Sequence, residues 1–316
     1  MIINLLLFTV GLIMLVGGAE GLVRGATRVA RALGVGPFLV GFTIVTFGTT
    51  APEQVVSISA ALRGNADLAL GNVVGSNIVN VGLVLGAAAV VAPFTAHLRL
   101  LRVETPLVVL VSVLLWLLCS DGTLSRLDGA MLLCGFTGLV VYMYRSARSE
   151  PPEVKAEVGK EAAVKMPVWQ AAVVMSAGLA ILIGGAQLMV YAAVEIARAL
   201  GVSEWLIGLT VVAVGTSLPE LAAAVVGAFR GESDLVLGNV VGSCLFNILM
   251  ILGLTSVIEP MTVPPAALAV DLRVMLGFAV ALLLIVANGL RVYRWEGIVL
   301  LVGYGSFIAW QVQEAN

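Results

Sequence analysis

Residues 70–80 read LGNVVGSNIVN and residues 237–247 read LGNVVGSCLFN, so nearly the same eleven-residue segment occurs twice in the chain. We call these two stretches the first and second GNVVGS segments. Positions 17–93 align with positions 184–260 without a gap, and 36 of the 77 aligned residues are identical. The identities include Gly, Pro, Glu and Asn in register, whereas chance similarity between apolar helices would match mainly Leu and Val. The chain therefore contains an internal duplication.

The composition is that of a membrane protein. Hydrophobic residues make up 60% of the chain and charged residues only 11%, with a mean hydropathy of +1.08, whereas a soluble domain carries about 25% charged residues. Ten apolar runs are long enough to cross a hydrocarbon core of roughly 30 Å. Because backbone in lipid must satisfy its own hydrogen bonds, we expect each run to be helical. The runs lie at about 2–23, 37–62, 70–91, 105–119, 128–144, 168–190, 205–228, 236–258, 273–288 and 296–311.

Several features that could indicate another class of protein do not do so here. The first apolar run lacks a basic start and an A-x-A site, and it recurs as 168–190, so we expect a retained helix and not a signal peptide. The three cysteines lie in apolar runs without paired spacing, which favours packing roles. The one histidine, His97, falls in a short loop where we expect it to be solvated.

The ten runs divide into two halves of five. We expect a first half at 1–144, with its repeat at about 37–91, a linker at 145–167, and a second half at 168–316, with its repeat at about 205–258. Because five is odd, the second half enters the membrane from the opposite side and the repeats are inverted. Inverted repeats with interrupted helices are typical of secondary transporters, which bind their substrates near the bilayer midplane.

The basic residues predict the orientation of the chain. If the N-terminus lies outside, thirteen of the 17 Lys and Arg residues fall in loops that face the cytoplasm. Cytoplasmic loops of membrane proteins carry an excess of Lys and Arg. We therefore expect both termini outside and the 145–167 linker in the cytoplasm.

The second helix of each half contains a predicted break, in GFTIVTFGTTAPEQ (41–54) and GLTVVAVGTSLPEL (208–221). Gly48 and Gly215 are suited to end a helical half. Pro52 and Pro219 suit the first turn of a new one, where no amide donor is required. We therefore predict that helices 2 and 7 are each broken into two pieces.

Two glutamates follow these breaks. Glu53 and Glu220 stand three residues after a hydroxyl residue (Thr50 and Ser217), which is the spacing of a capping box. A carboxylate at a membrane helix centre costs at least about 2.5–3.5 kcal/mol and usually marks an ion pathway. Two of them would balance one divalent cation, and Ca²⁺ takes 6–8 oxygen ligands. We expect further oxygens from carbonyls freed at the breaks, those of Thr46, Thr49, Ala213 and Thr216. Capping and ion binding are compatible interpretations.

The GNVVGS segments carry a second set of polar groups. Ser76 and Asn80 are four residues apart on a helix and share a face, as do Ser243 and Asn247. The glycines follow a small-xxx-small pattern that lets helices approach closely; they are Gly71, Gly75, Gly238 and Gly242. An alternative interpretation is that the whole motif serves helix packing, with Ser and Asn supplying interhelical hydrogen bonds.

The pairing of G-T-[TS]-x-P-E with a following G-N-V-V-G-S-x-x-x-N, duplicated in inverted halves, resembles the α-repeats of the sodium/calcium exchanger family of cation/calcium antiporters. The resemblance implies an all-α polytopic membrane protein, of the compact type found in the plasma (inner) membrane of prokaryotes. It implies a secondary active antiporter that exchanges Na⁺ for Ca²⁺ by alternating access. In this family helices one and six, here 2–23 and 168–190, slide against the rest.

The resemblance also assigns roles to the polar residues, position by position. It implies Glu53 and Glu220 as the carboxylates of the calcium site, with Thr49 and Thr216 contributing mainly through backbone carbonyls. Ser76 and Ser243, with the carbonyls of Thr46 and Ala213, fall at flanking sodium sites. Asn80 and Asn247 face the centre, and Thr50 and Ser217 line the breaks. Some members, including potassium-dependent ones, have Asp at the position of Asn247, so its amide argues against potassium dependence.

Other functions are compatible with parts of this pattern. Proton-coupled calcium exchange could use the same two glutamates, although Ser, Thr and carbonyl oxygens suit sodium better. A passive cation channel would not need inverted repeats with paired broken helices, and an intramembrane enzyme would need nucleophile or metal motifs that the sequence lacks. Oxygen ligands also suit other hard cations such as Mn²⁺. We expect no cofactor and no nucleic-acid partner, and a chain that works as a monomer in the bilayer.

Overall fold

The computed structural model describes residues 2–33, 37–64, 66–96, 98, 100–148, 167–200, 213–265 and 267–314. The first half contains α1 (Ile2–Leu33), α2 (Pro37–Val40), η1 (Gly41–Val45), α3 (Thr46–Thr49), α4 (Ala51–Leu62), α5 (Ala66–Val79), η2 (Asn80–Leu85), α6 (Gly86–Val91), β1 (Phe94–Thr95), η3 (Leu100–Glu104), α7 (Thr105–Leu118), η4 (Cys119–Asp121), β2 (Thr123–Leu124) and α8 (Arg126–Arg148). The second half contains α10 (Val168–Ala199), α12 (Ala213–Thr216), α13 (Leu218–Phe229), α14 (Ser233–Leu245), η6 (Phe246–Leu252), α15 (Gly253–Ile258), β3 (Met261–Thr262), η7 (Ala267–Asp271), α16 (Leu272–Ala287), β4 (Arg291–Val292) and α17 (Arg294–Glu314). Segments η1, η2, η3, η6 and η7 are π-helical.

The sequence repeat is also a structural repeat. The offset that aligns position 17 with position 184 carries both ends of α4 onto the ends of α13, and it carries the last residues of α3 and η3 onto those of α12 and η7. Even the π-helical turn of η3 returns in η7 at the equivalent residues. The duplication therefore reproduces local backbone geometry and not only composition.

Two short antiparallel ribbons join the halves and confirm that the repeats are inverted. Strand β1 pairs with β4, and β2 pairs with β3, so each ribbon takes one strand from each half. The repeat offset carries β1 onto β3, and β2 and β4 lie in equivalent connections. Because η3 and α7 run between β1 and β2, the ribbons cap opposite ends of the bundle. A pseudo-twofold axis between the halves exchanges the two ribbons.

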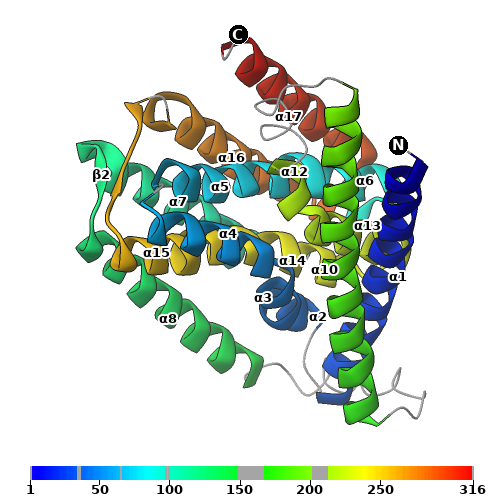
Figure 1. Cartoon of the computed structure of the whole chain (residues 1–316). Helices are drawn as coiled ribbons and strands as arrows, with labels where there is room; N and C mark the ends of the chain where they lie inside the picture. The colour runs from blue at the N-terminus through cyan, green and yellow to red at the C-terminus, as the bar shows by residue number, and fades with distance from the viewer. Residues whose placement is uncertain are drawn as a thin grey trace.

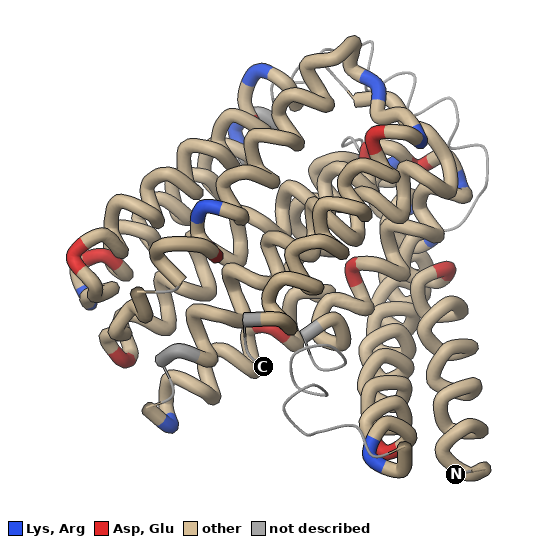
Figure 2. Tube along the Cα trace, turned by 90° about the horizontal axis from the view of Figure 1, so that it is seen from above, with Lys and Arg blue, Asp and Glu red and all other residues tan. Residues whose placement is uncertain are grey.

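The helix count agrees with the ten predicted runs. Within the described residues, eight helices are long and apolar enough to cross a membrane. The remaining two runs appear as the shorter apolar helices Phe38–Thr49 and Leu218–Phe229. Both are short because helices 2 and 7 are interrupted, as the sequence predicts. Figure 2 shows Lys and Arg near the ends of helices, with long uncharged stretches between them.

Some predicted boundaries were wrong. Helices α1 and α10 each contain 32 residues and continue well beyond the runs 2–23 and 168–190. Hydropathy identifies the part of a helix suited to hydrocarbon, whereas the hydrogen-bond ladder continues into the polar ends. Three predictions fall outside the described residues: His97, most of the linker, and the start of the seventh run at 205–212. Cys119 and Cys244 are buried free thiols, as expected of packing residues, whereas Cys134 is exposed.

Helices α1 and α10 form a closely packed antiparallel pair. Figure 1 shows them side by side, crossing the remaining helices at a large angle. Their backbones touch at glycines: a Cβ on Gly25 would come within 2.5 Å of the Met175 nitrogen, and one on Gly185 within 2.5 Å of the Leu15 nitrogen. The pair belongs to a hydrophobic cluster separate from the main core of the bundle. The same cluster includes Leu218 of α13 and Leu235 of α14, so the pair packs against the second half of helix 7 and the start of helix 8.

The GNVVGS segments lie at the centre of the bundle. In the spans that contain them, Leu68–Val91 and Ser233–Ile258, 78% and 94% of an 18-residue window is buried, against 22–39% in the other six spans. Polar groups on these two helices are therefore shielded from lipid.

Candidate ion-binding site

The breaks in helices 2 and 7 occur at single residues. Thr50 separates α3 from α4, and Ser217 separates α12 from α13. Pro52 and Pro219 lie in the first turns of α4 and α13, where a missing amide donor is tolerated. The predicted role of the two prolines is confirmed.

The predicted role of the two glycines was wrong. Gly48 and Gly215 lie inside α3 and α12 and do not end them. A Cβ on Gly48 would overlap the side chain of Leu179, and one on Gly215 would come within 2.5 Å of a methyl group of Val190. Both neighbours belong to α10, so these glycines allow α10 to pass close to each break.

The capping-box interpretation was also wrong. Neither Thr50 nor Ser217 makes a side-chain hydrogen bond that caps its helix. The Thr50 hydroxyl donates back to the carbonyl of Thr46 at 2.8 Å. The Ser217 hydroxyl donates instead to Oε1 of Glu53, at 3.1 Å and across the interface between the halves. The residue pair predicted to act locally thus forms a contact between repeats.

The carbonyls beside the two breaks differ. The Thr46 carbonyl is not freed, because it accepts the Thr50 amide at 2.9 Å in addition to the Thr50 hydroxyl. In the second half the Ser217 amide donates to Val214 at 3.1 Å, one residue later than the equivalent of Thr46. These backbone hydrogen bonds at the two breaks therefore involve non-equivalent carbonyls, those of Thr46 and Val214.

Both glutamates are buried, each with 1% of its surface exposed. Within the described residues, Oε2 of Glu53 and both carboxylate oxygens of Glu220 have no hydrogen-bond partner. Buried charges in proteins are paired or coordinate metals, because an unpaired charge in a low dielectric is very costly. Three of the four carboxylate oxygens thus lack a hydrogen-bond donor among the described residues, and the fourth accepts the Ser217 hydroxyl.

Neutral oxygens share this unusual state. Oδ1 of Asn80, Oδ1 of Asn247 and Oγ of Ser243 are buried and have no partner among the described residues. The Asn247 side-chain amide donates to Oδ1 of Asn77 at 3.3 Å, which orients the Asn247 group and leaves its oxygen available. Together with the three carboxylate oxygens, six buried oxygens of predicted site residues are available for a cation.

The two asparagines occupy a special backbone position. Asn80 begins the π-helical segment η2, and Asn247 is the second residue of η6. Single π-helical turns inside α-helices are frequent at functional sites because they redirect side chains. The asparagine at the end of each GNVVGS segment therefore lies where the α-helix changes to a π-helix.

The site is assembled from both halves. Helix α4, which carries Glu53, contacts η6, which carries Asn247, and α13, which carries Glu220, contacts η2, which carries Asn80. Likewise α3 contacts α14, and α12 contacts α5. Each broken helix therefore faces the GNVVGS segment of the other half. The candidate residues of the two halves therefore lie on helices that contact one another across the interface between the halves.

Two further asparagines, Asn72 and Asn239, were not predicted as site residues. Oδ1 of Asn239 accepts the Thr49 hydroxyl at 3.2 Å. The Asn72 amide donates to Oγ of Ser57 at 2.9 Å and to the Glu53 carbonyl at 3.3 Å. These amides hold the broken helices in place. Their signal in the sequence was the Asn shared by both GNVVGS segments.

The packing role of the glycines holds for only one copy. A Cβ on Gly238 would overlap the Phe38 carbonyl oxygen, and one on Gly242 would lie 2.5 Å from the Thr46 hydroxyl. On Gly71 or Gly75, a Cβ would meet no atom of the described residues within 4 Å. These two glycines line a cavity instead.

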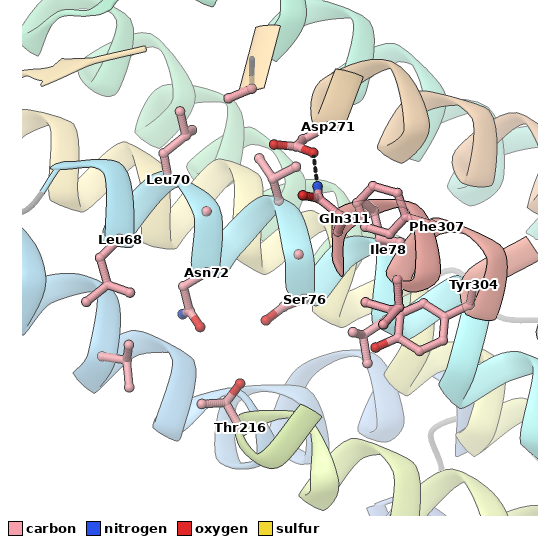
Figure 3. A pocket seen from close by; sticks show the side chains of 17 residues that line it. Leu68, Leu70, Asn72, Ser76, Ile78, Thr216, Asp271, Tyr304, Phe307 and Gln311 are labelled. Carbon is pink, nitrogen blue, oxygen red and sulfur yellow. Dashed lines mark hydrogen bonds between the residues drawn. The ribbon is translucent and has the colours of Figure 1, made fainter. Parts of the chain in front are cut away.

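Two cavities reach the site. The first, the α5–α17 cavity, has a volume of about 340 Å³ and extends from Asn72, Ser76 and Thr216 to Asp271 and Gln311 (Figure 3). The second has a volume of about 450 Å³ and lies between α4 and α10. Thr216 lines both cavities, so they converge beside the break in helix 7.

Comparisons with known proteins agree with this architecture. The chain is similar to CaxA of Alkalimonas amylolytica, with 42% identity over 98% of both chains, and to the inner membrane protein YrbG of Escherichia coli, with 36% identity over 98% of this chain and 96% of YrbG. It is 30% identical to the sodium/calcium exchanger MaX1 of Methanosarcina acetivorans over 97% of both chains. A structure of the sodium-calcium exchanger NCX_Mj soaked with Na⁺ and Sr²⁺ superimposes with a TM-score of 0.85 at 31% identity over 98% of both chains.

The match extends to the family level in both halves. The family described as sodium/calcium exchanger protein matches residues 3–145 and again residues 170–313. One range lies in each half of the chain, and together they include both glutamates and both GNVVGS segments. The chain is therefore an integral membrane transporter that belongs to the sodium/calcium exchanger family.

Proposed function

We propose that this protein is a secondary active antiporter that exchanges Na⁺ for Ca²⁺ by alternating access. The observation that carries the proposal is the set of six buried oxygens without hydrogen-bond partners among the described residues, drawn from both halves. Two are neutral amide oxygens, one is a hydroxyl, and three belong to the carboxylates of Glu53 and Glu220. Oxygen ligands with two negative charges suit a single Ca²⁺ ion, which takes 6–8 of them.

The neutral oxygens support sodium as the counter-ion. In this proposal Ser76 and Ser243, with the carbonyls of Thr46 and Ala213, contribute to flanking sodium sites. Thr49 and Thr216 contribute backbone carbonyls to the calcium site, while Thr50 and Ser217 line the breaks. The name of MaX1, a sodium/calcium exchanger, and the soak of NCX_Mj with Na⁺ and Ca²⁺ favour the same ion pair. The alternative is a proton-coupled exchanger of Ca²⁺ or another divalent cation, in which the two glutamates release protons when the metal binds.

Alternating access is supported by the packing of the α1–α10 pair. Most buried residues of the second hydrophobic cluster lie on this pair, and Gly48 and Gly215 remove side chains where α10 passes the two breaks. A sliding motion of the pair would therefore meet little obstruction at the site. In this proposal both termini and the Asp271 end of the α5–α17 cavity lie outside, as the distribution of Lys and Arg favours, and the cavity is the access route from that side.

Flux measurements in proteoliposomes test the proposal directly. Purified protein is reconstituted, and Ca²⁺ uptake is followed while a Na⁺, K⁺ or pH gradient is imposed, one at a time. We expect saturable uptake driven by an outward Na⁺ gradient and none driven by K⁺ alone. Uptake driven by pH alone would establish the proton-coupled alternative, and flux without a counter-ion would indicate a channel.

The substitution Asn247→Asp should change cation selectivity. It adds a third negative charge to the buried oxygen set and removes the amide that donates to Asn77. Because ligand charge count tunes Ca²⁺ affinity, we expect the ratio of apparent Ca²⁺ to Na⁺ affinity to change by about ten-fold or more. The measurement is uptake as a function of Na⁺, K⁺ and Ca²⁺ concentration.

The matching variant Asn80→Asp tests the same idea in the other half. Pseudo-symmetry predicts a change in the same direction, because the Asn80 oxygen is buried and available in the same way. If both variants kept wild-type dependence on all three cations, neither asparagine would face the ion site.

A further inference from the structure

We propose that Asp271 is a capture residue: it concentrates cations at the entrance of the α5–α17 cavity and sets the apparent ion affinity on that side of the membrane. This inference rests on the proposed antiport and adds a residue outside the ion ligands. Asp271 is the fifth residue of the apolar span Ala267–Ala287. An ionisable residue within such a span is costly and typically marks an ion pathway.

Asp271 does not serve the local fold as a helix cap. It occupies the N-cap position of α16, yet its side chain makes no capping hydrogen bond. Its Oδ1 instead accepts a hydrogen bond of 2.6 Å from the side-chain amide of Gln311, near the end of α17. The carboxylate is thus oriented by a neutral partner from another helix, which does not cancel its negative charge.

The walls of the cavity strengthen the effect of this charge. Asp271 is the only acidic or basic residue among the described residues that line the cavity. Most of the others are apolar, including Val56, Leu68 and Phe307. Figure 3 shows Asp271 and Gln311 on one side of the cavity, opposite Ser76 and Thr216. Low-dielectric walls focus the field of a charge and raise the local concentration of counter-ions.

The first half contains an acid at the equivalent position. Glu104 is the last residue of η3, as Asp271 is the last residue of η7, and the repeat offset carries one onto the other. Their neighbours differ, LLRV in one copy and ALAV in the other, yet both copies end in a carboxylate. Glu104 has only 1% of its surface exposed, whereas Asp271 is partly exposed. Asp271, the more exposed of the two acids, is the one that lines a cavity. This is expected when ions can reach the site from only one side of the membrane.

The variant Asp271→Asn tests the proposal because Asn still offers an oxygen to Gln311. We expect the KM for Ca²⁺ presented from the cavity side to rise about ten-fold, with kcat unchanged. The KM for Na⁺ should rise only about three-fold. A given electrostatic potential changes the energy of a divalent ion by twice as much as that of a monovalent ion, so the fold-change in KM for Ca²⁺ is the square of the fold-change for Na⁺. Both effects should shrink as ionic strength rises.

Controls separate capture from a structural role. Asp271→Glu keeps the charge and should restore wild-type KM values. Glu259→Gln removes an exposed carboxylate from the connection that leads into η7 and should leave both KM values unchanged. An unchanged KM in Asp271→Asn, an equal shift in Glu259→Gln, or a loss of kcat that salt does not reduce would each overturn the proposal.

Calorimetric titration of the purified protein with Ca²⁺ and with Na⁺ makes the test independent of transport. Asp271→Asn should weaken Ca²⁺ binding more than Na⁺ binding, in the same squared relation. If the wild type exchanges neither ion and Asp271→Asn nevertheless shows this weaker binding, the proposed antiport fails while the capture role stands. If exchange occurs and the variant binds like the wild type, only the capture role fails.

Discussion

Replacing Glu53 or Glu220 with Gln should abolish Ca²⁺ exchange while leaving the protein folded. Gln has the same shape but removes one of the two negative charges that would balance the divalent ion. Loss of an outer-shell partner of a metal ligand already costs about 10–100-fold, so we expect a loss of more than about 100-fold on removing a charged ligand. The measurement is Ca²⁺ uptake into Na⁺-loaded proteoliposomes.

Thermal unfolding distinguishes this loss from misfolding. A ligand at 100 times its Kd stabilises the folded state by about 2.7 kcal/mol, so Ca²⁺ should raise the Tm of the wild type and not that of the Gln variants. Without Ca²⁺ the variants should be at least as stable as the wild type, because Gln removes a buried charge without an ionic partner; three of the four carboxylate oxygens have no hydrogen-bond partner among the described residues. Glu259→Gln, an exposed carboxylate, serves as the matched control. Wild-type transport by either site variant would show that the paired-carboxylate site is wrong.

Replacing Gly18 with Leu should separate the α1–α10 pair and eliminate transport. A Cβ at Gly18 would overlap the backbone of Leu182 and come close to the carbonyl oxygen of Gly178. Backbone cannot move aside as a side chain can, so the two helices must part. Overpacking of this kind costs about 1–3 kcal/mol or more, and it also disrupts the body that is proposed to slide.

The neighbouring glycine provides a matched control. Gly17 is exposed, and a Cβ placed there meets no atom of the described residues within 4 Å. Gly17→Leu should therefore keep wild-type Tm and exchange, although it makes the same substitution one residue away. Equal behaviour of the two variants, in thermal unfolding and in Ca²⁺ uptake, would contradict the close packing of α1 against α10.

Much of the architecture could be predicted because its signals are local or repeated. Apolar length predicts the spans, and the register of Gly, Pro, Glu and Asn between positions 17–93 and 184–260 reveals the duplication. Five spans per half require inversion. The two β-ribbons, each built from one strand of each half, confirm it. Pro52 and Pro219 identify the breaks because a missing amide donor acts within its own helix.

The contacts between halves could not be predicted in this way. The hydroxyl of Ser217 has a glutamate three residues later in its own helix, yet it bonds Glu53, 164 residues away. Gly48 looks like a helix end but makes room for Leu179 of α10. In each case the partner comes from another helix, and sequence spacing carries no information about that helix.

The sequence by itself determined which chemistry this protein carries: two carboxylates, two Ser–Asn pairs and two broken helices, each present once in every half. Only the tertiary structure decided how the copies differ. Gly242 is packed against Thr46, whereas its equivalent Gly75 lines a cavity, and the Thr46 carbonyl is occupied by Thr50. The physical reason is that a repeat encodes the same side chains twice, but each side chain's contacts depend on where the opposite half is packed.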